Sequence, residues 1–148
     1  MRLEQLKSDF EVLDDWQDRY RHIIELGREL PPLAAAARVP ANKVSGCASQ
    51  VWLAVTVSGS GDNPVLHFSG DSDALIVKGL IAIAFMLYSD RTAREILETD
   101  ANGALAGLGL AEHLTPQRSN GFAAMIRRIK SDASAALQGV SPGGMSGR

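Results

Sequence analysis

The sequence contains a single cysteine, Cys47, among its 148 residues. One thiol cannot close a disulfide within the chain, build a cysteine-rich zinc site, or hold an iron–sulfur cluster on thiolates alone. Disulfides are rare in reducing compartments, so their absence is consistent with the cytoplasm, and we expect a cytoplasmic protein.

The sequence also lacks an excess of basic residues and a long hydrophobic run. Lys and Arg number 15 against 17 Asp and Glu, whereas a general electrostatic grip on nucleic acid or an anionic membrane needs a positive excess. The longest apolar run, Gly79 to Tyr88, is well short of the roughly 20 residues of a membrane helix. The charged N-terminus has no apolar signal-peptide core. We therefore expect no nucleic-acid partner and no membrane association.

What the sequence does contain is typical of a globular protein. Apolar residues make up 45% and charged residues 22%, and a chain of this length can bury a substantial core. We find no internal repeat and no linker, so we expect one domain over residues 1–138. Residues 139–148 are rich in Gly and Ser, which predicts a flexible C-terminal tail.

The N-terminal third is predicted to form two helices. Apolar residues recur at three- and four-residue steps from Leu3 to Leu13, which places them on one helical face. Asp14 or Asp15 is suited to cap a second helix. That helix is predicted to end before the proline pair at 31–32, because proline disfavours helix in the residue before it.

The middle of the chain is predicted to form an antiparallel sheet. Residues 51–57 alternate between two faces, and residues 58–64 are rich in turn-forming residues, so a second strand at 65–69 is predicted to return antiparallel. A short extended piece at 41–44 is a candidate third strand.

The remaining sequence is predicted to be helical. Asp71 or Ser72 is predicted to cap an almost uniformly apolar, central helix that runs to Tyr88. Thr92 with Glu95 predicts a capping box, residues 102–110 a frayed helix followed by a loop, and 115–116 the start of the last helix. Helices on one side of a small antiparallel sheet give an α+β fold.

Cys47 lies in a short segment of small polar residues, Ser45-Gly46-Cys47-Ala48-Ser49, between the extended piece and the first strand. This position predicts a loop tip, where a thiol can reach a partner. A lone cysteine is nevertheless more often a small buried packing residue than a reactive one. The composition of the segment favours reactivity without deciding it.

Four blocks in order resemble the SufE family of sulfur-acceptor proteins, which includes the CsdE branch. They are Asn42-Lys43-Val44-Ser45-Gly46-Cys47-Ala48-Ser49-Gln50-Val51-Trp52-Leu53; Ile24-Glu25-Leu26-Gly27 with Leu30-Pro31; Gly70-Asp71-Ser72-Asp73-Ala74 with Ile76-Val77-Lys78-Gly79-Leu80; and His113-Leu114-Thr115-Pro116 with Arg118-Ser119-Asn120-Gly121. The resemblance extends from about residue 3 to residue 136 and implies an α+β fold like that of the IscU-type scaffolds.

The resemblance implies a function in sulfur transfer. Proteins of this family accept persulfide sulfur from a PLP-dependent cysteine desulfurase of the SufS or CsdA type, stimulate that enzyme, and pass the sulfur towards iron–sulfur cluster assembly. The chain is then not an independent enzyme. It binds no cofactor of its own, since PLP belongs to the desulfurase, and its further partner is a downstream scaffold or another sulfur acceptor. A second thiol would attack the persulfide, so having only one fits this chemistry.

The resemblance assigns the acceptor role to Cys47. Arg118 follows a helix start, where anions are favoured, and is a candidate for supporting the thiolate or the loop; the alternative is an exposed charge or a structural hydrogen bond. Candidate partner-binding residues are Lys43, Ser45, Gly46, Ala48, Ser49, Gln50 and Asp73. The simplest interpretation of Asp71 and Asp73 is that they are helix caps and acidic residues of the first helical turn. Trp52 is assigned to the core, and a solvated helix face is assigned to Arg127, Arg128 and Lys130. His113 is disfavoured as a metal ligand, because the sequence offers no second ligand near it.

Two other functions are alternatives to sulfur transfer. The protein could regulate a desulfurase without accepting sulfur, with Cys47 merely structural. An iron–sulfur scaffold is disfavoured because such a site needs more ligands. A permanently exposed persulfide would be lost to small thiols, so we expect the Cys47 side chain to lie partly in an apolar pocket of the free protein.

Overall fold

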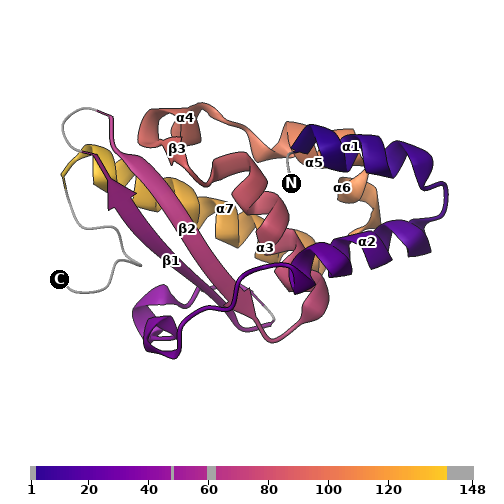
Figure 1. The fold of residues 1–148 in the computed structure, drawn as a ribbon, viewed down its shortest axis with the longest axis horizontal. Coiled ribbons are helices and arrows are strands. Elements are labelled where there is room, and N and C mark those ends of the chain that lie inside the picture. Colours follow the sequence, from indigo (N-terminus) through magenta and orange to yellow (C-terminus); the bar gives the residue numbers. More distant parts are fainter. Residues whose placement is uncertain (1–2, 48, 60–62, 140–148) are drawn as a thin grey trace.

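The computed structural model describes residues 3–47, 49–59 and 63–139. Figure 1 shows the three-stranded sheet beside long helices, with α1 and α2 at the end of the molecule opposite the connection between β1 and β2. The elements in chain order are α1 (Leu3–Val12), α2 (Trp16–Arg28), the 3-10 turns η1 (Ala35–Ala37) and η2 (Pro40–Asn42), β1 (Val51–Ser58), β2 (Val65–Ser72), α3 (Leu75–Tyr88), β3 (Arg91–Thr92), α4 (Ala93–Glu98), α5 (Ala101–Leu108), α6 (Leu110–His113) and α7 (Pro116–Leu137).

The sheet has the strand order β1-β2-β3, with both pairs antiparallel. The predicted return of the second strand is confirmed. The candidate third strand at 41–44 is wrong, because Pro40 begins a 3-10 turn and only Lys43 makes an isolated bridge, to Trp52. The third strand is instead β3, which pairs with the first two residues of β2.

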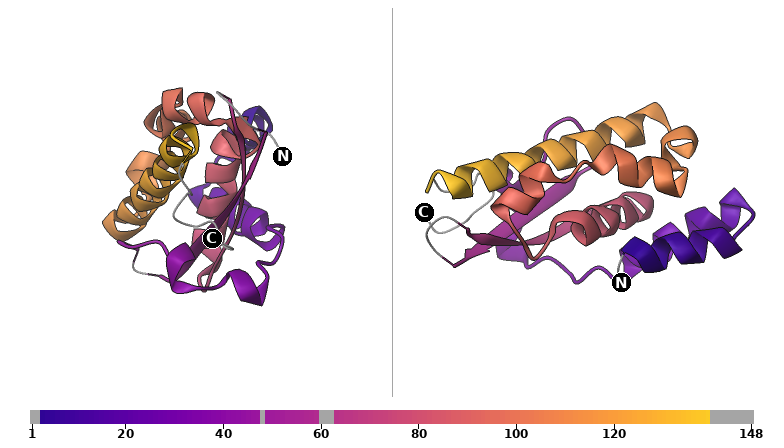
Figure 2. Two further views of the ribbon diagram at one scale, coloured as in Figure 1. Left: turned by 90° about the vertical axis from the view of Figure 1, so that its left-hand side faces the viewer. Right: turned by 90° about the horizontal axis from the view of Figure 1, so that it is seen from above.

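Helices α3 and α7 pack against one face of this sheet, as Figure 2 shows from two further directions. Leu53 and Val55 are buried on that face, and their cross-strand partners Gly70 and Phe68 are buried with them. Phe68 stacks on Phe85 of α3, with ring centroids 6.1 Å apart. The alternate residues of β1 are half-buried or exposed. The predicted α+β arrangement, with helices on one side of a small sheet, is confirmed.

Helix α3 is the centre of the hydrophobic core, as its composition predicts. Most of its residues are buried, and it packs against α2, where Gly27 and Gly79 bring the two backbones together. A Cβ atom built on Gly27 would lie 2.7 Å from the Gly79 nitrogen and 2.8 Å from the Leu75 carbonyl oxygen. Only glycine permits this approach, because real Cβ atoms do not come so close to backbone atoms.

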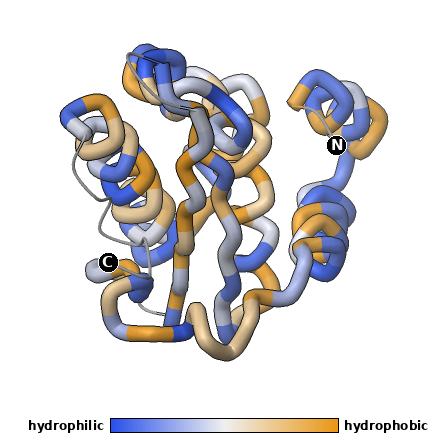
Figure 3. Tube along the Cα trace, turned by 60° about the vertical axis from the view of Figure 1, so that its left-hand side comes forward, coloured by the Kyte–Doolittle hydropathy of each residue, from blue (hydrophilic) through white to orange (hydrophobic). Residues whose placement is uncertain are grey.

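The N-terminal helices α1 and α2 form a hairpin. A side-chain cap starts α2, and each helix buries one side against the core. The Asp15 carboxylate accepts a hydrogen bond from the Gln17 N–H at 3.0 Å, so Asp15 is the cap of α2. Helix α2 ends at Arg28, before the proline pair, as predicted. Hydrophilic and hydrophobic segments alternate along α1, α2 and α7 in Figure 3, as expected for helices with one buried side.

The boundary between β2 and α3 differs from the prediction. Strand β2 continues to Ser72 because its partner strand offers pairs as far as Val51, which lies opposite Ser72. Helix α3 therefore begins only at Leu75, and its N-cap, Ala74, has no side-chain cap. Asp71 and Ser72 are strand residues and do not cap the helix.

The C-terminal half follows its local signals with one difference. Thr92 and Glu95 form the predicted capping box, and the Thr115 hydroxyl accepts from the Arg118 N–H at 3.3 Å at the start of α7. Residues 102–110 were expected to be a frayed helix and loop. Instead Asp100 caps a complete α5, which ends at Leu108 and is followed by Gly109 in the left-handed conformation (φ 73°). The predicted tail, apart from Gly139, lies outside the described residues.

Candidate functional site

The cysteine lies on a loop whose two ends are tied together. Lys43 forms a bridge with Trp52, and the Val44 N–H donates to the Val51 carbonyl oxygen at 2.9 Å. The residues between them therefore form a loop that leaves and re-enters the sheet at one point. Gly46 has φ +90°, a left-handed conformation that glycine adopts without strain. The predicted loop position of Cys47 is confirmed.

The Cys47 side chain is half-buried and turned towards α7. Its thiol donates a weak hydrogen bond to the Gly121 carbonyl oxygen, with sulfur and oxygen 3.6 Å apart. A Cβ atom built on Gly121 would lie 3.7 Å from the Cys47 sulfur, so the absence of a side chain there leaves room beside the thiol. This burial confirms the expectation that the thiol is tucked into the free protein.

The thiol opens into a cavity of about 180 Å³, which we name the Cys47 pocket. The cysteine loop, the start of α3 and the first turns of α7 build it together. Its deeper wall is apolar, and polar side chains of the loop and α7 stand beside it. The lining residues are Cys47, Ser49, Ala74, Ile76, Val77, Leu80, Thr115, Gln117, Arg118, Gly121, Phe122 and Met125.

The surroundings of Cys47 favour the neutral thiol. Burial raises the pKa of Cys47 above its ordinary value, and the positive charge of Arg127 opposes that rise. The hydrogen bond to the Gly121 carbonyl also needs the proton on sulfur, which favours the neutral form. The thiol in this position is therefore less ionised at neutral pH than an exposed cysteine.

Asp73 fixes the exit of the cysteine loop. Its carboxylate accepts from the Gln50 N–H at 3.1 Å, and its own N–H donates to the Gln50 carbonyl oxygen at 3.3 Å. The prediction that Asp73 lies in the first turn of a helix is wrong, because α3 begins two residues later. The exposed Asp73 side chain instead joins the loop to the turn between β2 and α3.

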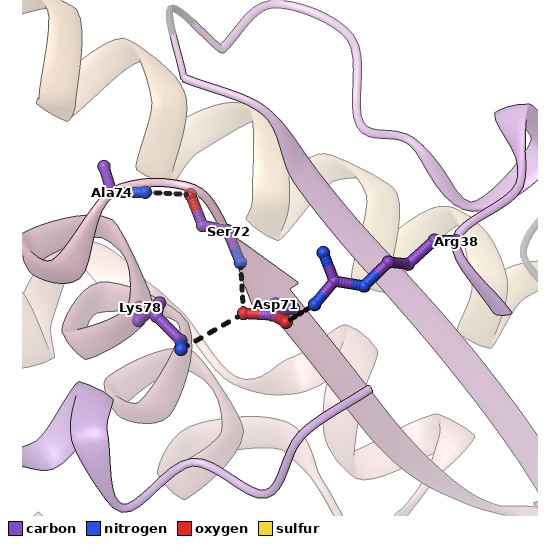
Figure 4. A network of polar contacts seen from close by, with 5 residues as sticks. All are labelled: Arg38, Asp71, Ser72, Ala74 and Lys78. Carbon is purple, nitrogen blue, oxygen red and sulfur yellow. Dashed lines mark hydrogen bonds and ion pairs between the residues drawn. The ribbon is translucent and has the colours of Figure 1, made fainter. Parts of the chain in front are cut away.

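Asp71 is the centre of a polar network that joins three segments (Figure 4). Its buried carboxylate contacts Arg38, lies 3.4 Å from the Lys78 ammonium, and accepts from the Ser72 N–H at 2.8 Å. The Ser72 hydroxyl in turn accepts from the Ala74 N–H at 3.2 Å. Two cations compensate the buried charge, so Asp71 holds the end of β2 against α3 and the segment before η2.

Trp52 and Arg128 are placed differently from the sequence interpretation. Trp52 is half-buried on the outer face of the sheet, and the Arg38 guanidinium lies over its ring at 5.1 Å from the centroid. Arg128 was assigned to a solvated face, but it donates to the Ala41 carbonyl oxygen at 2.8 Å and to the buried Asp132 carboxylate at 3.3 Å. Arg128 thus ties α7 to the segment that enters the cysteine loop.

The predicted site residues gather around one loop. Arg118 and Ser49 line the Cys47 pocket together with the thiol. Lys43, Ser45, Gly46, Gln50 and Asp73 are exposed around the loop, while Ala48 lies outside the described residues. Arg127 is exposed, Lys130 is half-buried, and His113 stacks on Trp16 with ring centroids 3.7 Å apart.

Sequence reasoning missed two neighbours of the thiol, Gly121 and Arg127. Gly121 ends the block that contains Arg118, so the block itself was the available signal. No pattern in the sequence connects Arg127 with Cys47. Within residues 3–47, 49–59 and 63–139, no three His, Cys, Asp or Glu side chains are grouped so as to hold a metal ion. In the same ranges no helix is both long and apolar enough to cross a bilayer.

Comparison with known proteins assigns this site to a family. A family model described as an Fe-S metabolism associated domain, named SufE, matches residues 4–133. The chain belongs to the SufE family. The match includes the cysteine loop, the turn between β2 and α3, and the first turns of α7, so it spans every segment that builds the Cys47 pocket.

Two relatives support the assignment, and one solved structure shares the fold. The chain is 53% identical over 131 residues to an uncharacterized SufE-like protein of Rhizobium etli, with 88% of each covered. It is 50% identical over 135 residues to another of Rhizobium meliloti, covering 91% of this chain and 96% of that protein. A solution structure of a hypothetical protein from Thermus thermophilus has the same fold, with TM-score 0.71 at 22% identity, covering 92% of this chain and 96% of that one. The family places the protein in iron–sulfur metabolism.

Proposed function

We propose that this protein accepts sulfur from the persulfide of a cysteine desulfurase on Cys47 and carries it towards iron–sulfur cluster assembly. One observation supports this most: the sole thiol of the chain lies on a loop tied at both ends and turns into its own pocket. A structural cysteine would need neither the loop nor the adjacent cavity.

The transfer is a thiol–persulfide exchange. The deprotonated Cys47 sulfur attacks the outer sulfur of the partner's persulfide, a new sulfur–sulfur bond forms at Cys47, and the partner's own sulfur–sulfur bond breaks. The partner's cysteine leaves as a thiolate and the Cys47 proton passes to solvent, so the overall step involves no net oxidation or reduction. By clearing the desulfurase cysteine, the step stimulates that enzyme.

The resting geometry and the reaction require different positions of the thiol. Burial and the hydrogen bond to Gly121 keep the thiol neutral and partly covered, whereas attack needs an accessible thiolate. We propose that docking draws the loop outwards, which removes the burial that raises the pKa, and that the sulfurated side chain then returns to the pocket. The apolar wall and Gly121 beside the thiol leave room for the added sulfur.

Intact-protein mass spectrometry tests the proposal. The protein is mixed with the desulfurase of the same genome, PLP and free cysteine, and the wild type is expected to gain one sulfur atom. Cys47→Ser, which keeps the size of the side chain, is expected to gain none and to lose its stimulation of turnover. A wild-type protein that stays unmodified beside an active desulfurase contradicts the proposal.

A non-covalent regulator of the desulfurase is the second candidate. The half-buried, neutral thiol is the observation that favours it, because such cysteines are commonly inert. The same variant separates the two: a regulator keeps its stimulation in Cys47→Ser, and a carrier loses stimulation while it can still bind.

A further inference from the structure

Charge is distributed unevenly in this weakly acidic protein. The segments that build the thiol end of the molecule, 38–50, 71–78 and 115–132, contain more basic than acidic residues, although acidic residues outnumber basic ones in the whole chain. The basic ones are Arg38, Lys43, Lys78, Arg118, Arg127, Arg128 and Lys130, and the acidic ones are Asp71, Asp73 and Asp132. Residues 3–30 show the opposite balance, with eight acidic and four basic side chains.

The acidic groups at the thiol end already have partners. Asp71 contacts both Arg38 and Lys78, and the buried Asp132 contacts Arg128. The exposed Asp73 accepts the Gln50 N–H. Several of the other cations at this end form no ion pair within the described ranges.

Three of those cations lie on the cysteine loop's entrance or on α7 beside the Cys47 pocket, and we name them the basic rim: Lys43, Arg118 and Arg127. Lys43 is exposed at the tied entrance of the cysteine loop. Arg118 lines the Cys47 pocket from α7. Arg127 is exposed on the same helix, and its charge acts on the Cys47 thiol. None of the three forms an ion pair within residues 3–47, 49–59 and 63–139.

We propose that the basic rim docks on an acidic protein surface surrounding the reactive sulfur of the desulfurase, an inference that rests on the proposed function. Unpaired charges at the edge of an interface attract a partner of opposite charge over long range and orient the encounter. The acidic side chains of α1 and α2 repel an acidic partner, whereas the basic rim attracts it. The charge distribution thus turns the thiol towards the partner.

A protein surface fits this end better than a nucleic acid or a membrane. Tight binding to the phosphates of DNA takes about six to ten contacts, more than the basic rim supplies. The chain also bears a net charge of −2, which weakens attraction to any polyanion at long range. Leu75, between two residues that line the pocket, is 46% exposed and offers an apolar contact of the kind found in protein–protein interfaces.

Binding is best measured in the Cys47→Ser background, so that changes in thiol chemistry do not enter. The desulfurase is titrated by calorimetry with Cys47→Ser alone and with Lys43→Glu and Arg127→Glu added, at low and high salt. At low salt the double reversal is expected to raise Kd by about tenfold or more, and the difference is expected to shrink as salt screens the charges.

Two control variants make the test specific. Reversal of Arg21 and Arg28, exposed on α2, changes the net charge equally without altering the basic rim and is expected to change Kd by no more than about twofold. Lys43→Arg with Arg127→Lys preserves the charges and is expected to bind like the parent. The inference is overturned if Kd does not change on reversal of Lys43 and Arg127, or if it changes equally on reversal of Arg21 and Arg28.

The remaining outcomes separate this inference from the proposed function. If wild-type protein gains sulfur on Cys47 but its binding is indifferent to salt and to the rim, only the docking inference fails. If rim-dependent binding is present without sulfur transfer, the carrier function fails and the docking surface stands. Absence of any binding to the desulfurase, or tighter binding to duplex DNA or anionic vesicles at physiological salt, overturns the docking inference.

Discussion

Two glycine contacts in this molecule differ in how much space they leave. Where α2 crosses α3, a Cβ atom on Gly27 would lie 2.7 Å from the Gly79 nitrogen, so the backbones are already as close as they can be. Beside the thiol, a Cβ atom on Gly121 would lie 3.7 Å from the Cys47 sulfur, an ordinary contact distance. The pair of Gly27 and Gly79 permits close packing, and Gly121 leaves room beside the thiol.

The difference separates a tightly packed part of the molecule from the part that moves in the proposed function. The α2–α3 crossing lies in the buried core, where added atoms have nowhere to go. The cysteine loop is held at its two ends, by Val44 with Val51 and by Gln50 with Asp73. Among the described residues, the hydrogen bond from its apex to α7 is the weak one from the Cys47 thiol. Such an arrangement lets the apex leave the pocket without disturbing the core.

The largest expected effect is that of Gly79→Ala. The added methyl would collide with the backbone of Ile23, so we expect the free energy of unfolding to fall by about 3 kcal/mol or more. Urea unfolding followed by circular dichroism measures it. Gly103→Ala is the matched control, because nothing lies within 4 Å of its added Cβ; it should stabilise α5 by up to about 1 kcal/mol. Equal effects of the two changes would contradict the comparison.

Next in size is the effect of filling the space beside the thiol. In Gly121→Val the additional methyl groups compete with the Cys47 sulfur, so we expect the thiol to be displaced. Its reaction with a bulky aromatic disulfide should then accelerate on the order of tenfold, because exchange depends on access. Gly121→Ala adds only a methyl at contact distance and should react at nearly the wild-type rate. A Val variant that folds and reacts no faster would show that the pocket does not limit access.

Asp73→Ala tests the brace at the loop exit. Removing the acceptor leaves the Gln50 N–H without its partner, and we expect the stability to fall by about 1 kcal/mol. Hydrogen exchange at the Gln50 amide should become faster, while exchange in α3 stays slow. Asp73→Asn keeps a carbonyl oxygen in place and should restore most of the protection. Unchanged exchange at Gln50 in the Ala variant would show that the brace does not hold the loop.

The smallest expected effect concerns the pKa of Cys47. Arg127 lowers the pKa against the effect of burial, so Arg127→Gln should raise it further and reduce the thiolate fraction below that pKa. Alkylation by iodoacetamide at pH 7 should slow by about two- to fivefold, with the difference disappearing at high pH and weakening in salt. Arg127→Lys, which keeps the charge, should show the wild-type dependence of the alkylation rate on pH. If the alkylation rates of the Gln variant and the wild type show the same dependence on pH, Arg127 does not affect the pKa of Cys47.

Elements with local signals were predicted well from the sequence. The capping box of Thr92 and Glu95, the Thr115 cap and the alternation of β1 each depend on residues close together in the chain, and each was confirmed. The third strand and the end of β2 were not predicted, because they depend on which strand lies alongside. Asp71 looked like a cap, and pairing with β1 made it a strand residue instead.

The candidate site divides in the same way. The loop position of Cys47 follows from its small neighbours and the strand that comes next, and Arg118 was found through the resemblance of its block. The Gly121 carbonyl lies 74 residues from the thiol along the chain. Arg128, assigned to a solvated face, reaches a carbonyl 87 residues away. No pattern in the sequence predicts either contact.

By itself the sequence determined that this protein has one thiol. It also determined most of the helices and strands, because caps, turns and periodic hydrophobicity act within a few residues. Only the tertiary structure decided how deeply that sulfur is buried, which carbonyl oxygen accepts its hydrogen bond and which cations lie near it. Those properties arise where the loop, α3 and α7 meet, and burial and Coulomb interactions depend on distance in space.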